Sequence, residues 1–289
     1  MNRAVASFLC VVLAWGVAVA CHRSGATDAG HEPRRVVSLS PSTTEAVFAL
    51  GAGDRLVGRS RYCDYPPAAL RVPAVGGVVD PSFEAILGLA PDLVIGARGP
   101  AGRSMVDRLE ARGIATFFPP TDSLAEIDTM ARDLGKKLGA EAAAAKLVAQ
   151  MASERTAVER AVAGRARPTV LLLFGLRPIV AAGPGSFPDE MIRVAGGRNA
   201  VSVGARFPTL GVERVMALDP DVVVDATSVA EHDPSGTLAA ELPGWSALRA
   251  VREKRIVPLK DESALRPGPR IGQGLRALAR ALHPGVAIP

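Results

Sequence analysis

Aromatic and histidine side chains are scarce in this chain of 289 residues, and their scarcity excludes several kinds of site. Aromatic residues make up 4% of the sequence, so a large flat ligand would have to be held by few rings. The four histidines are His22, His31, His232 and His283. Because the first two lie in an N-terminal tail and the last lies among the final residues, we expect neither a histidine-rich metal site nor histidine-based catalysis.

Cysteine is also rare, and the charge is not concentrated in one region. Cys10 and Cys21 fall in the N-terminal leader, so Cys63 is the only cysteine of the body and an internal disulfide is excluded there. The net charge is +5, but the arginines are scattered and no nucleic-acid motif is present, so no nucleic-acid partner is expected. With 48% hydrophobic and 22% charged residues, the composition is that of one large or two mid-sized globular domains.

The motifs of common enzyme classes are missing. Ser40 and Ser42 follow a predicted strand as a nucleophile would, yet no Gly-x-Ser-x-Gly elbow surrounds them. The glycine-rich segment 183–186 lacks the Gly-Lys-Ser/Thr of a phosphate-binding loop. Cys63 has no acid–base partner near it in the sequence. We therefore expect a protein that is not an enzyme; an exported α/β hydrolase and a lipid-anchored sensor or adhesion module are the alternatives.

The N-terminus has the pattern of a secretory signal peptide. One positive charge precedes an apolar run from Ala4 to Ala20, which ends in small residues. Small residues directly before Cys21 resemble a bacterial lipobox, in which this cysteine is acylated and becomes the mature N-terminus. We predict a signal peptide over 1–20 and a flexible, lipid-anchored tether over 21–33, with an ordinary signal peptide ending near a cysteine as the alternative.

The rest of the chain alternates strand and helix patterns. Val36 to Leu39 reads as a short buried strand, and Ser42 with Glu45 three residues later has the spacing of a capping box for a helix that ends at Gly51. The next predicted elements are helices over 83–90 and 103–112 and strands over 93–95 and 114–118. This alternation predicts a mostly parallel α/β sheet.

The sequence contains an internal repeat. Residues 83–97 match residues 212–226, with Glu, Leu, Pro, Asp, Val and Ala in register. A second match sets 44–51 beside 189–196, and a predicted strand precedes each copy. The two halves therefore look like two copies of one α/β unit, which we place at 34–133 and 167–289.

A helical stretch lies between the two copies, over 134–166. Ser123 and Glu126 form a capping box for a first helix, and an alanine-rich run follows from Ala140 to Ala163. At about 1.5 Å per residue this run gives a rod of about 36 Å, enough to bridge two lobes. The alternative is a long surface helix within a single domain.

Two facing α/β lobes would enclose a ligand cleft lined by the loops that follow the strands. Arginines and aromatic residues gather in these loops: Arg59, Arg61, Arg98, Arg177, Arg206, Arg266, Arg270, Tyr62, Tyr65, Phe174, Phe187 and Phe207. Any single arginine is more often a solvated surface charge. The cluster suits a large ligand that is partly flat and partly anionic.

Four segments carry a family resemblance: Val36–Glu45 (VVSLSPSTTE), Arg61–Pro66 (RYCDYP), Asp80–Glu84 (DPSFE) and Pro91–Ile95 (PDLVI). In this order they resemble the substrate-binding proteins of ABC importers for vitamin B12, ferric siderophores and haem. The Tyr-x-Asp-Tyr-Pro element resembles the cobalamin branch. The resemblance covers residues 34 to about 283 and implies two lobes joined by one stiff helix with limited closure. It also implies an ABC permease with its ATPase subunits as partners, and no cofactor besides the transported ligand.

The resemblance also implies ligand-binding residues. They are Tyr62, Phe174 and Phe207 as rings against the corrin and Arg266 as a polar contact. We also expect Tyr65, a cleft-loop residue close to Tyr62, to bind the ligand. The cobalamin pattern has tryptophans where this chain has Val78 and Ala97, and an aspartate where it has Glu262. The expected ligand is cobalamin. Because the loss of two rings changes the affinity or the ligand, another corrinoid, haem and a ferric siderophore are the alternatives.

Glu84 and Glu213 occupy the same position in the two copies, each before a Pro-Asp turn. A carboxylate in the first turn of a helix interacts favourably with the helix N-terminus, and that explanation needs no partner. In the family resembled, glutamates at these matching positions form salt bridges with permease arginines. The resemblance therefore implies that Glu84 and Glu213 dock the protein on its permease.

Overall fold

A computed structural model describes residues 32–99, 102–227, 244–259 and 262–288. Residues 32–289 form one compact unit, and the following description concerns that unit alone. The predicted signal peptide, Cys21 and nearly all of the predicted tether lie outside the described residues.

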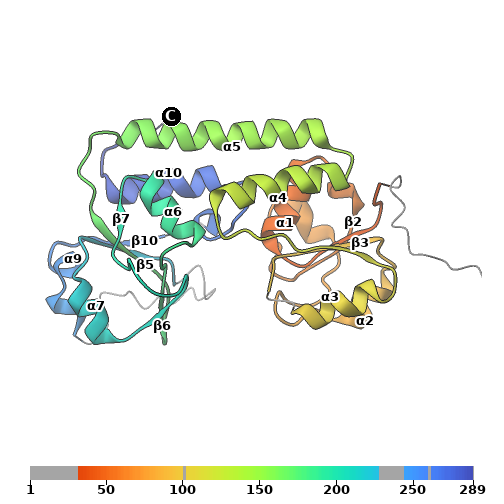
Figure 1. Ribbon diagram of the computed structural model, residues 1–289, viewed down its shortest axis with the longest axis horizontal. Helices are drawn as coiled ribbons and strands as arrows, with labels where there is room; N and C mark the ends of the chain where they lie inside the picture. The colour runs from red at the N-terminus through yellow and green to blue at the C-terminus, as the bar shows by residue number, and fades with distance from the viewer. Residues whose placement is uncertain (1–31, 100–101, 228–243, 260–261, 289) are drawn as a thin grey trace, which may run out of the picture. The chain divides into compact units, whose positions relative to one another are not determined.

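The N-terminal part is built on a four-stranded parallel sheet in the order β2-β1-β3-β4 (Figure 1). Its strands are β1 (Val36–Ser38), β2 (Leu56–Arg59), β3 (Leu93–Ile95) and β4 (Ala115–Phe117). Its helices are α1 (Pro41–Ala49), α2 (Phe83–Gly88) and α3 (Arg103–Glu110), with short 3-10 helices η1 (Gly53–Arg55) and η2 (Pro67–Arg71). Every residue of β1 and β3 is buried, as expected for parallel strands covered by helices on both faces.

The C-terminal part has a second sheet in the order β10-β9-β5-β6-β8, with β7 also paired to β5. Its strands are β5 (Thr169–Leu176), β6 (Ile179–Ala181), β7 (Arg198–Asn199), β8 (Thr209–Leu210), β9 (Val222–Asp225) and β10 (Ile256–Pro258). Its helices are α6 (Phe187–Val194), α7 (Val212–Leu218), α9 (Arg249–Arg252) and α10 (Ile271–Leu282), with 3-10 helices η4 (Trp245–Ala247) and η5 (Glu262–Ala264).

This second sheet is less parallel than the sequence predicts. Strands β7, β9 and β10 join it in parallel, but β6 and β8 pair antiparallel. The reason is the connection between β5 and β6, which consists of Arg177 and Pro178 alone. Two residues suffice for a hairpin, whereas a parallel crossover needs about a dozen or more.

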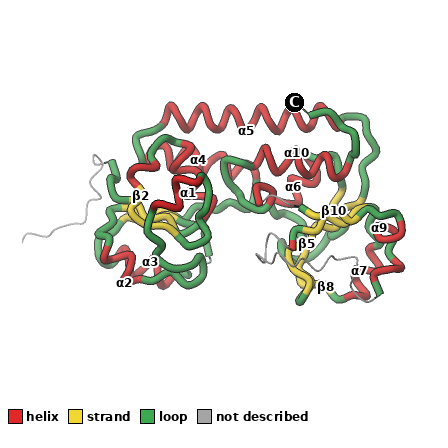
Figure 2. The backbone as a smooth tube through the Cα atoms, turned by 180° about the vertical axis from the view of Figure 1, so that it is seen from behind, coloured by secondary structure: helices red, strands yellow, loops and turns green. Residues whose placement is uncertain are grey.

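Two long helices connect the sheets: α4 (Leu124–Lys137) and α5 (Glu141–Val162), with α5 alongside α4 and α10 (Figures 1 and 2). The helix predicted over 140–163 is thus α5. One apolar cluster runs from Val36 on β1 through Leu134 and Met151 on these helices to Val170 on β5. The predicted fold class, two α/β lobes bridged by one long helix, is confirmed, and the exact lobe boundaries stay a prediction. None of the described helices is both long and apolar enough to span a membrane.

The two predicted capping boxes have different outcomes. At α4, the Ser123 hydroxyl accepts the N–H of Glu126 at 3.1 Å, and the Glu126 carboxylate accepts the N–H of Asp122 at 2.7 Å. At α1 the prediction is wrong, because the helix begins at Pro41 with Ser40 as its N-cap residue. Proline is preorganised for the first helical position, so the helix starts before Ser42. Glu45 therefore has no capping role, and its side chain has other partners.

The internal repeat has a structural basis in its Pro-Asp turns. The Asp92 carboxylate accepts the N–H groups of Arg34 and Arg35 at 2.8 and 3.0 Å, directly before β1. In the second copy, the Asp221 carboxylate accepts the N–H of Thr169 at 2.7 Å, at the start of β5. Each aspartate thus satisfies backbone donors at the entrance of a central strand, which explains why the motif occurs in both copies.

Candidate functional site

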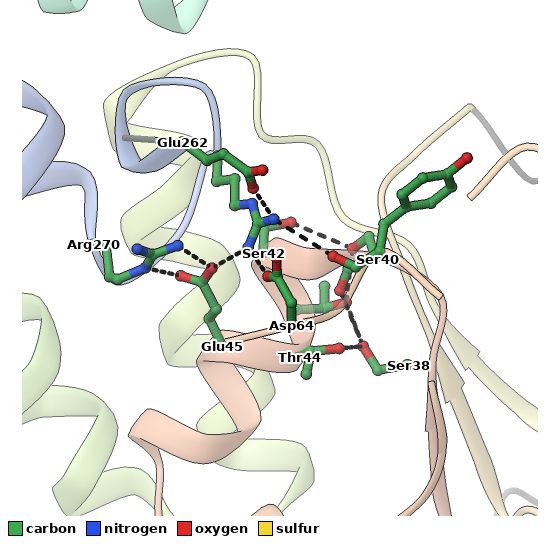
Figure 3. A network of polar contacts seen from close by, with 11 residues as sticks. Ser38, Ser40, Ser42, Thr44, Glu45, Asp64, Glu262 and Arg270 are labelled. Carbon is green, nitrogen blue, oxygen red and sulfur yellow. Dashed lines mark hydrogen bonds and ion pairs between the residues drawn. The ribbon is translucent and has the colours of Figure 1, made fainter. Parts of the chain in front are cut away.

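A cluster of buried hydroxyl groups fixes the turn between β1 and α1. Ser38 Oγ lies 2.8 Å from Thr43 Oγ1 and accepts a hydrogen bond from Thr44 Oγ1 at 2.8 Å. Ser40 Oγ also lies 2.8 Å from Thr43 Oγ1, and Figure 3 shows the start of α1 with these groups. Because each hydroxyl both donates and accepts, this turn satisfies its own buried polar groups and fixes the direction of α1.

Glu45 projects from α1 to two arginines of the C-terminal part. Arg270 donates from Nε to Glu45 Oε2 at 2.9 Å and from Nη2 to Glu45 Oε1 at 2.8 Å. Arg266 Nη1 donates to the same Oε1 at 3.1 Å. The Glu45 side chain is only 2% exposed, so this ion pair forms away from water (Figure 3). A bidentate, desolvated pair of this kind has strong geometric preferences.

Arg266 lies at the centre of the same network. Its Nη1 also donates to Asp64 at 2.7 Å, and its Nη2 contacts Glu262 and the carbonyl oxygen of Tyr62, the latter at 3.5 Å. Its two terminal nitrogens thus face four oxygen partners, which matches their four hydrogen atoms. The role of Arg266 as a ligand contact stays a prediction, and in this structure its guanidinium is directed to protein groups.

Two exposed tyrosines belong to the loop that Arg266 contacts. The Tyr65 ring lies under the guanidinium of Arg270, 4.0 Å from ring centroid to Cζ. The Tyr62 ring lies 5.7 Å from the Cζ of Arg61. Both rings are about 40% exposed, so each has an arginine beside it and a surface open to a ligand.

The other two predicted ligand rings meet on the C-terminal part. Phe174 on β5 and Phe207 before β8 form an edge-to-face pair, with centroids 5.6 Å apart and an interplanar angle of 71°. Phe207 is 45% exposed. The structure thus places Phe174 beside Phe207, and their role toward a ligand stays a prediction. Phe187, also predicted to line the cleft, is instead buried in the core at the start of α6.

Most arginines of the predicted cleft loops already have partners. Arg61 pairs with Asp80, and Arg206 pairs with Asp122 at 2.9 Å. The Arg59 guanidinium donates to backbone carbonyl groups. With Arg266 and Arg270 on Glu45, five of the seven have protein acceptors. Arg98 and Arg177 are exposed and form no ion pair within the described part of the chain.

A hollow of about 630 Å³ adjoins the network on the side of the long helices. Residues of α1, α5 and α10 line it, and Glu45, Tyr65 and Arg270 are among its lining residues. Within the described ranges, no three His, Cys, Asp or Glu side chains are grouped to hold a metal ion. Burial raises the pKa of the Cys63 thiol, which keeps it protonated and poorly nucleophilic.

Glu84 and Glu213 lie at corresponding places in the first turns of α2 and α7. Both side chains are exposed, and neither has an ion pair with any other described residue. Figures 1 and 2 place α2 and α7 on the side of the sheets away from α5. The N-cap of α2 is satisfied by the Ser82 hydroxyl, which accepts the N–H of Ala85 at 3.3 Å. Their docking role stays a prediction.

Glu45 is the residue of this site that sequence reasoning missed. Its partners lie 221 and 225 residues away, so no local spacing reveals them. The internal repeat contains one signal, because it aligns Glu45 with Glu190. Glu190 on α6 also binds a distant segment, accepting the N–H of Leu124 at 2.8 Å.

Comparisons with known proteins agree with this architecture. The chain is 33% identical over 263 residues to a cobalamin-binding protein of Halobacterium salinarum, covering 87% of this chain and 70% of that protein. It is 28% identical over 260 residues to an ABC transporter substrate-binding lipoprotein of Bacillus subtilis, covering 88% and 81% of the two chains. The solved structure of the periplasmic haem-binding protein RhuT from Roseiflexus sp. RS-1 superposes with a TM-score of 0.77 at 31% identity, over 86% of this chain and 98% of that one.

The sequence model of the family described as "Periplasmic binding protein" matches residues 36–263, which is most of the chain. This span contains both sheets, the connecting helices and the four rings discussed above. Members of this family bind solutes, in agreement with a site built from rings and paired charges. The chain belongs to the periplasmic binding protein family.

Proposed function

We propose that this protein captures a corrinoid, cobalamin or a close relative, and delivers it to an ABC permease with its ATPase subunits. The observation that carries the proposal is the arrangement of rings: exposed Tyr62 and Tyr65 on the N-terminal part, and exposed Phe207 with its partly buried neighbour Phe174 on the C-terminal part. Rings on both parts suit a broad, flat ligand held between them. A relative that is 33% identical is named a cobalamin-binding protein, which supports the same ligand.

The charge of the site also favours a corrinoid. Arg61, Arg206, Arg266 and Arg270 are neutralised by carboxylates of the protein itself. A ligand with several carboxylates would have to displace these protein carboxylates from the arginines. Its binding would gain little free energy, because each new ion pair replaces an existing one. The corrin periphery of cobalamin carries neutral amides, which require no free cation.

Haem is the second candidate, and one observation favours it specifically. The haem-binding protein RhuT is 31% identical over 86% of this chain. Tyr62 and Tyr65 are exposed phenols next to arginines, and a tyrosine oxygen is a known axial ligand of haem iron. Haem binding would therefore use the same loop, but through a bond from a tyrosine oxygen to the iron in place of ring contacts.

Calorimetric titration of the purified mature protein separates these candidates. The titrants are cyanocobalamin, cobinamide, ferric haem and a set of ferric siderophores. We expect the two corrinoids to bind at micromolar concentration or below, and haem to bind at least tenfold more weakly. Tight haem binding without corrinoid binding would reverse the assignment of ligand and leave the family membership unchanged.

The proposal includes a membrane anchor at Cys21 and permease docking by Glu84 and Glu213. A relative named a substrate-binding lipoprotein supports the anchor. Replacing Cys21 with Ser should move the protein from the membrane fraction to the soluble fraction of the cells, as detected by immunoblotting. If the Cys21→Ser protein stays in the membrane fraction as the wild type does, the cysteine is not the anchor.

A further inference from the structure

Glu45 on α1 connects the N-terminal part of the molecule to the C-terminal part, next to the loop that contains Tyr62 and Tyr65. Its carboxylate accepts three hydrogen bonds, from Nη1 of Arg266 and from Nε and Nη2 of Arg270. Both arginines belong to the segment between β10 and α10, whereas Glu45 lies on α1. Because the carboxylate is buried, water cannot easily replace either partner, and the link between the two segments is strong.

The two arginines carry this link on to the tyrosine loop. Arg266 donates to the Asp64 carboxylate and the Tyr62 carbonyl oxygen, and so holds the backbone of the loop. Arg270 lies over the ring of Tyr65 at 4.0 Å and so limits the orientation of that ring. Both exposed tyrosines are thus held by arginines that Glu45 itself holds in place.

Close backbone packing leaves little freedom at this junction. A Cβ atom on Gly268 would lie 3.3 Å from Cα, Cβ and the carbonyl oxygen of Ser42, at the start of α1. The hydroxyl cluster of Ser38, Ser40 and Thr43 fixes the direction of α1 itself. The position of the Glu45 carboxylate is therefore determined before any ligand arrives.

We propose that Glu45 is a positioning residue for ligand binding: through Arg266 and Arg270 it fixes loop 62–65 relative to segment 262–270, so that Tyr62 and Tyr65 are preorganised. The expected effect on ligand affinity rests on the proposed function. The fixing of loop 62–65 by Glu45 through the two arginines does not. A preorganised surface binds more tightly because less conformational entropy is lost on binding. Glu45 contributes this effect without touching the ligand.

Glu45→Gln tests the proposal, since it keeps the shape of the side chain and removes its charge. Arg266 keeps Asp64 and Glu262 as partners, so we expect the variant to fold. Hydrogen–deuterium exchange should become at least tenfold faster in 62–65 and 262–270, and affinity for cyanocobalamin should fall at least tenfold. If neither quantity differs from the wild type by more than twofold, the proposal is wrong.

Asp128→Asn is the matched control. Asp128 on α4 forms a largely buried bidentate pair with Arg155 on α5, at 3.0 and 2.7 Å, and this pair does not contact the tyrosine loop. We expect this variant to melt at a lower temperature and to keep wild-type exchange in 62–65 and 262–270. Equal losses of affinity in both variants would mean that general destabilisation, and not positioning, explains the effect of Glu45.

Two further outcomes are informative. If the wild-type protein does not bind cyanocobalamin, the proposed function fails, while the exchange measurement still decides the role of Glu45. If Glu45→Gln does not fold, Arg270→Gln replaces it, because Glu45 then keeps Arg266. In that variant, faster exchange confined to the loop around Tyr65 supports the proposal, and unchanged exchange contradicts it.

Discussion

Phe207 is the most exposed of the four rings that we propose as ligand contacts, and its neighbour Phe174 supports it from the side. Changing Phe207 to Ala should weaken corrinoid binding by about 1–3 kcal/mol, because a buried aromatic contact is lost and Phe174 loses its edge-to-face partner. Calorimetric titration with cyanocobalamin measures this loss. Melting temperature should change little, since Phe207 is half exposed in the free protein.

The control for Phe207→Ala is Val203→Ala in the same segment. Val203 is also an exposed apolar residue, but it has no ring to stack on a flat ligand. We expect its affinity to stay within about twofold of wild type. A similar loss in both variants would point to a disturbance of the whole segment, and the contact assigned to Phe207 would then be wrong.

At the scale of elements, the repeated Pro-Asp turn joins a helix, the strand that follows it and the entrance of the central strand. Asp221 illustrates the balance of forces. Burial opposes ionisation of its carboxyl group, but the N–H and hydroxyl of Thr169 and the charge of Arg249 outweigh burial, and its pKa is lowered. The Arg249 Nη1 atom lies 2.6 Å from Asp221 Oδ1. The ionised Asp221 carboxylate thus connects the turn before β9 to the start of β5 and to α9.

Asp221→Asn should lower the free energy of unfolding at pH 7 by about 1–2 kcal/mol, since hydrogen bonds to charged groups are lost or weakened. Because the folded-state pKa is lowered, the stabilisation by Asp221 is complete above the unfolded-state pKa of about 4. It is lost as the pH falls through the lower folded-state value. Urea titrations from pH 7 to pH 3 should therefore show the wild-type and variant curves converging at the acid end. A difference that is constant with pH would contradict a charge effect.

Some elements could be predicted from sequence because local chemistry alone determines them. Strand β3 lies where Leu93, Val94 and Ile95 follow a Pro-Asp turn, and α4 begins where Ser123 and Glu126 have capping spacing. The capping spacing of Ser42 and Glu45 places the start of α1 two residues too late, because the preference of Pro41 for the first helical position outweighs the hydroxyl of Ser42.

At the scale of the whole molecule, sequence patterns predict which residue types line a site better than they predict the partners of those residues. The arginines of the cleft loops predict a cationic lining for a partly anionic ligand. The structure instead pairs Arg266 and Arg270 with Glu45, and Arg206 with Asp122. Such pairings join residues about 80 to 225 positions apart, and only the folded chain determines them.

The internal repeat also makes a prediction about the whole molecule, because it places Glu84 and Glu213 at matching exposed positions on α2 and α7. If each carboxylate docks on one subunit of a two-fold permease, changing both residues to Ala should leave ligand affinity and melting temperature nearly unchanged. Uptake of the ligand in cells or proteoliposomes with the cognate importer should fall at least tenfold. Charge-assisted contacts at an interface mainly set orientation and association rate, so binding to the permease should slow.

The control for this double variant is Glu141→Ala with Glu159→Ala on α5, which changes the net charge equally. Figures 1 and 2 place α5 on the opposite side of the sheets from α2 and α7, and both of its control glutamates are exposed. We expect wild-type uptake in this control, because docking depends on the carboxylates of Glu84 and Glu213 and not on the net charge of the protein. Wild-type uptake with Glu84→Ala and Glu213→Ala would exclude the docking role. A melting temperature lowered by a few degrees, with wild-type uptake, would instead assign these carboxylates to the helix N-termini, where each exposed carboxylate contributes about 0.3–1 kcal/mol.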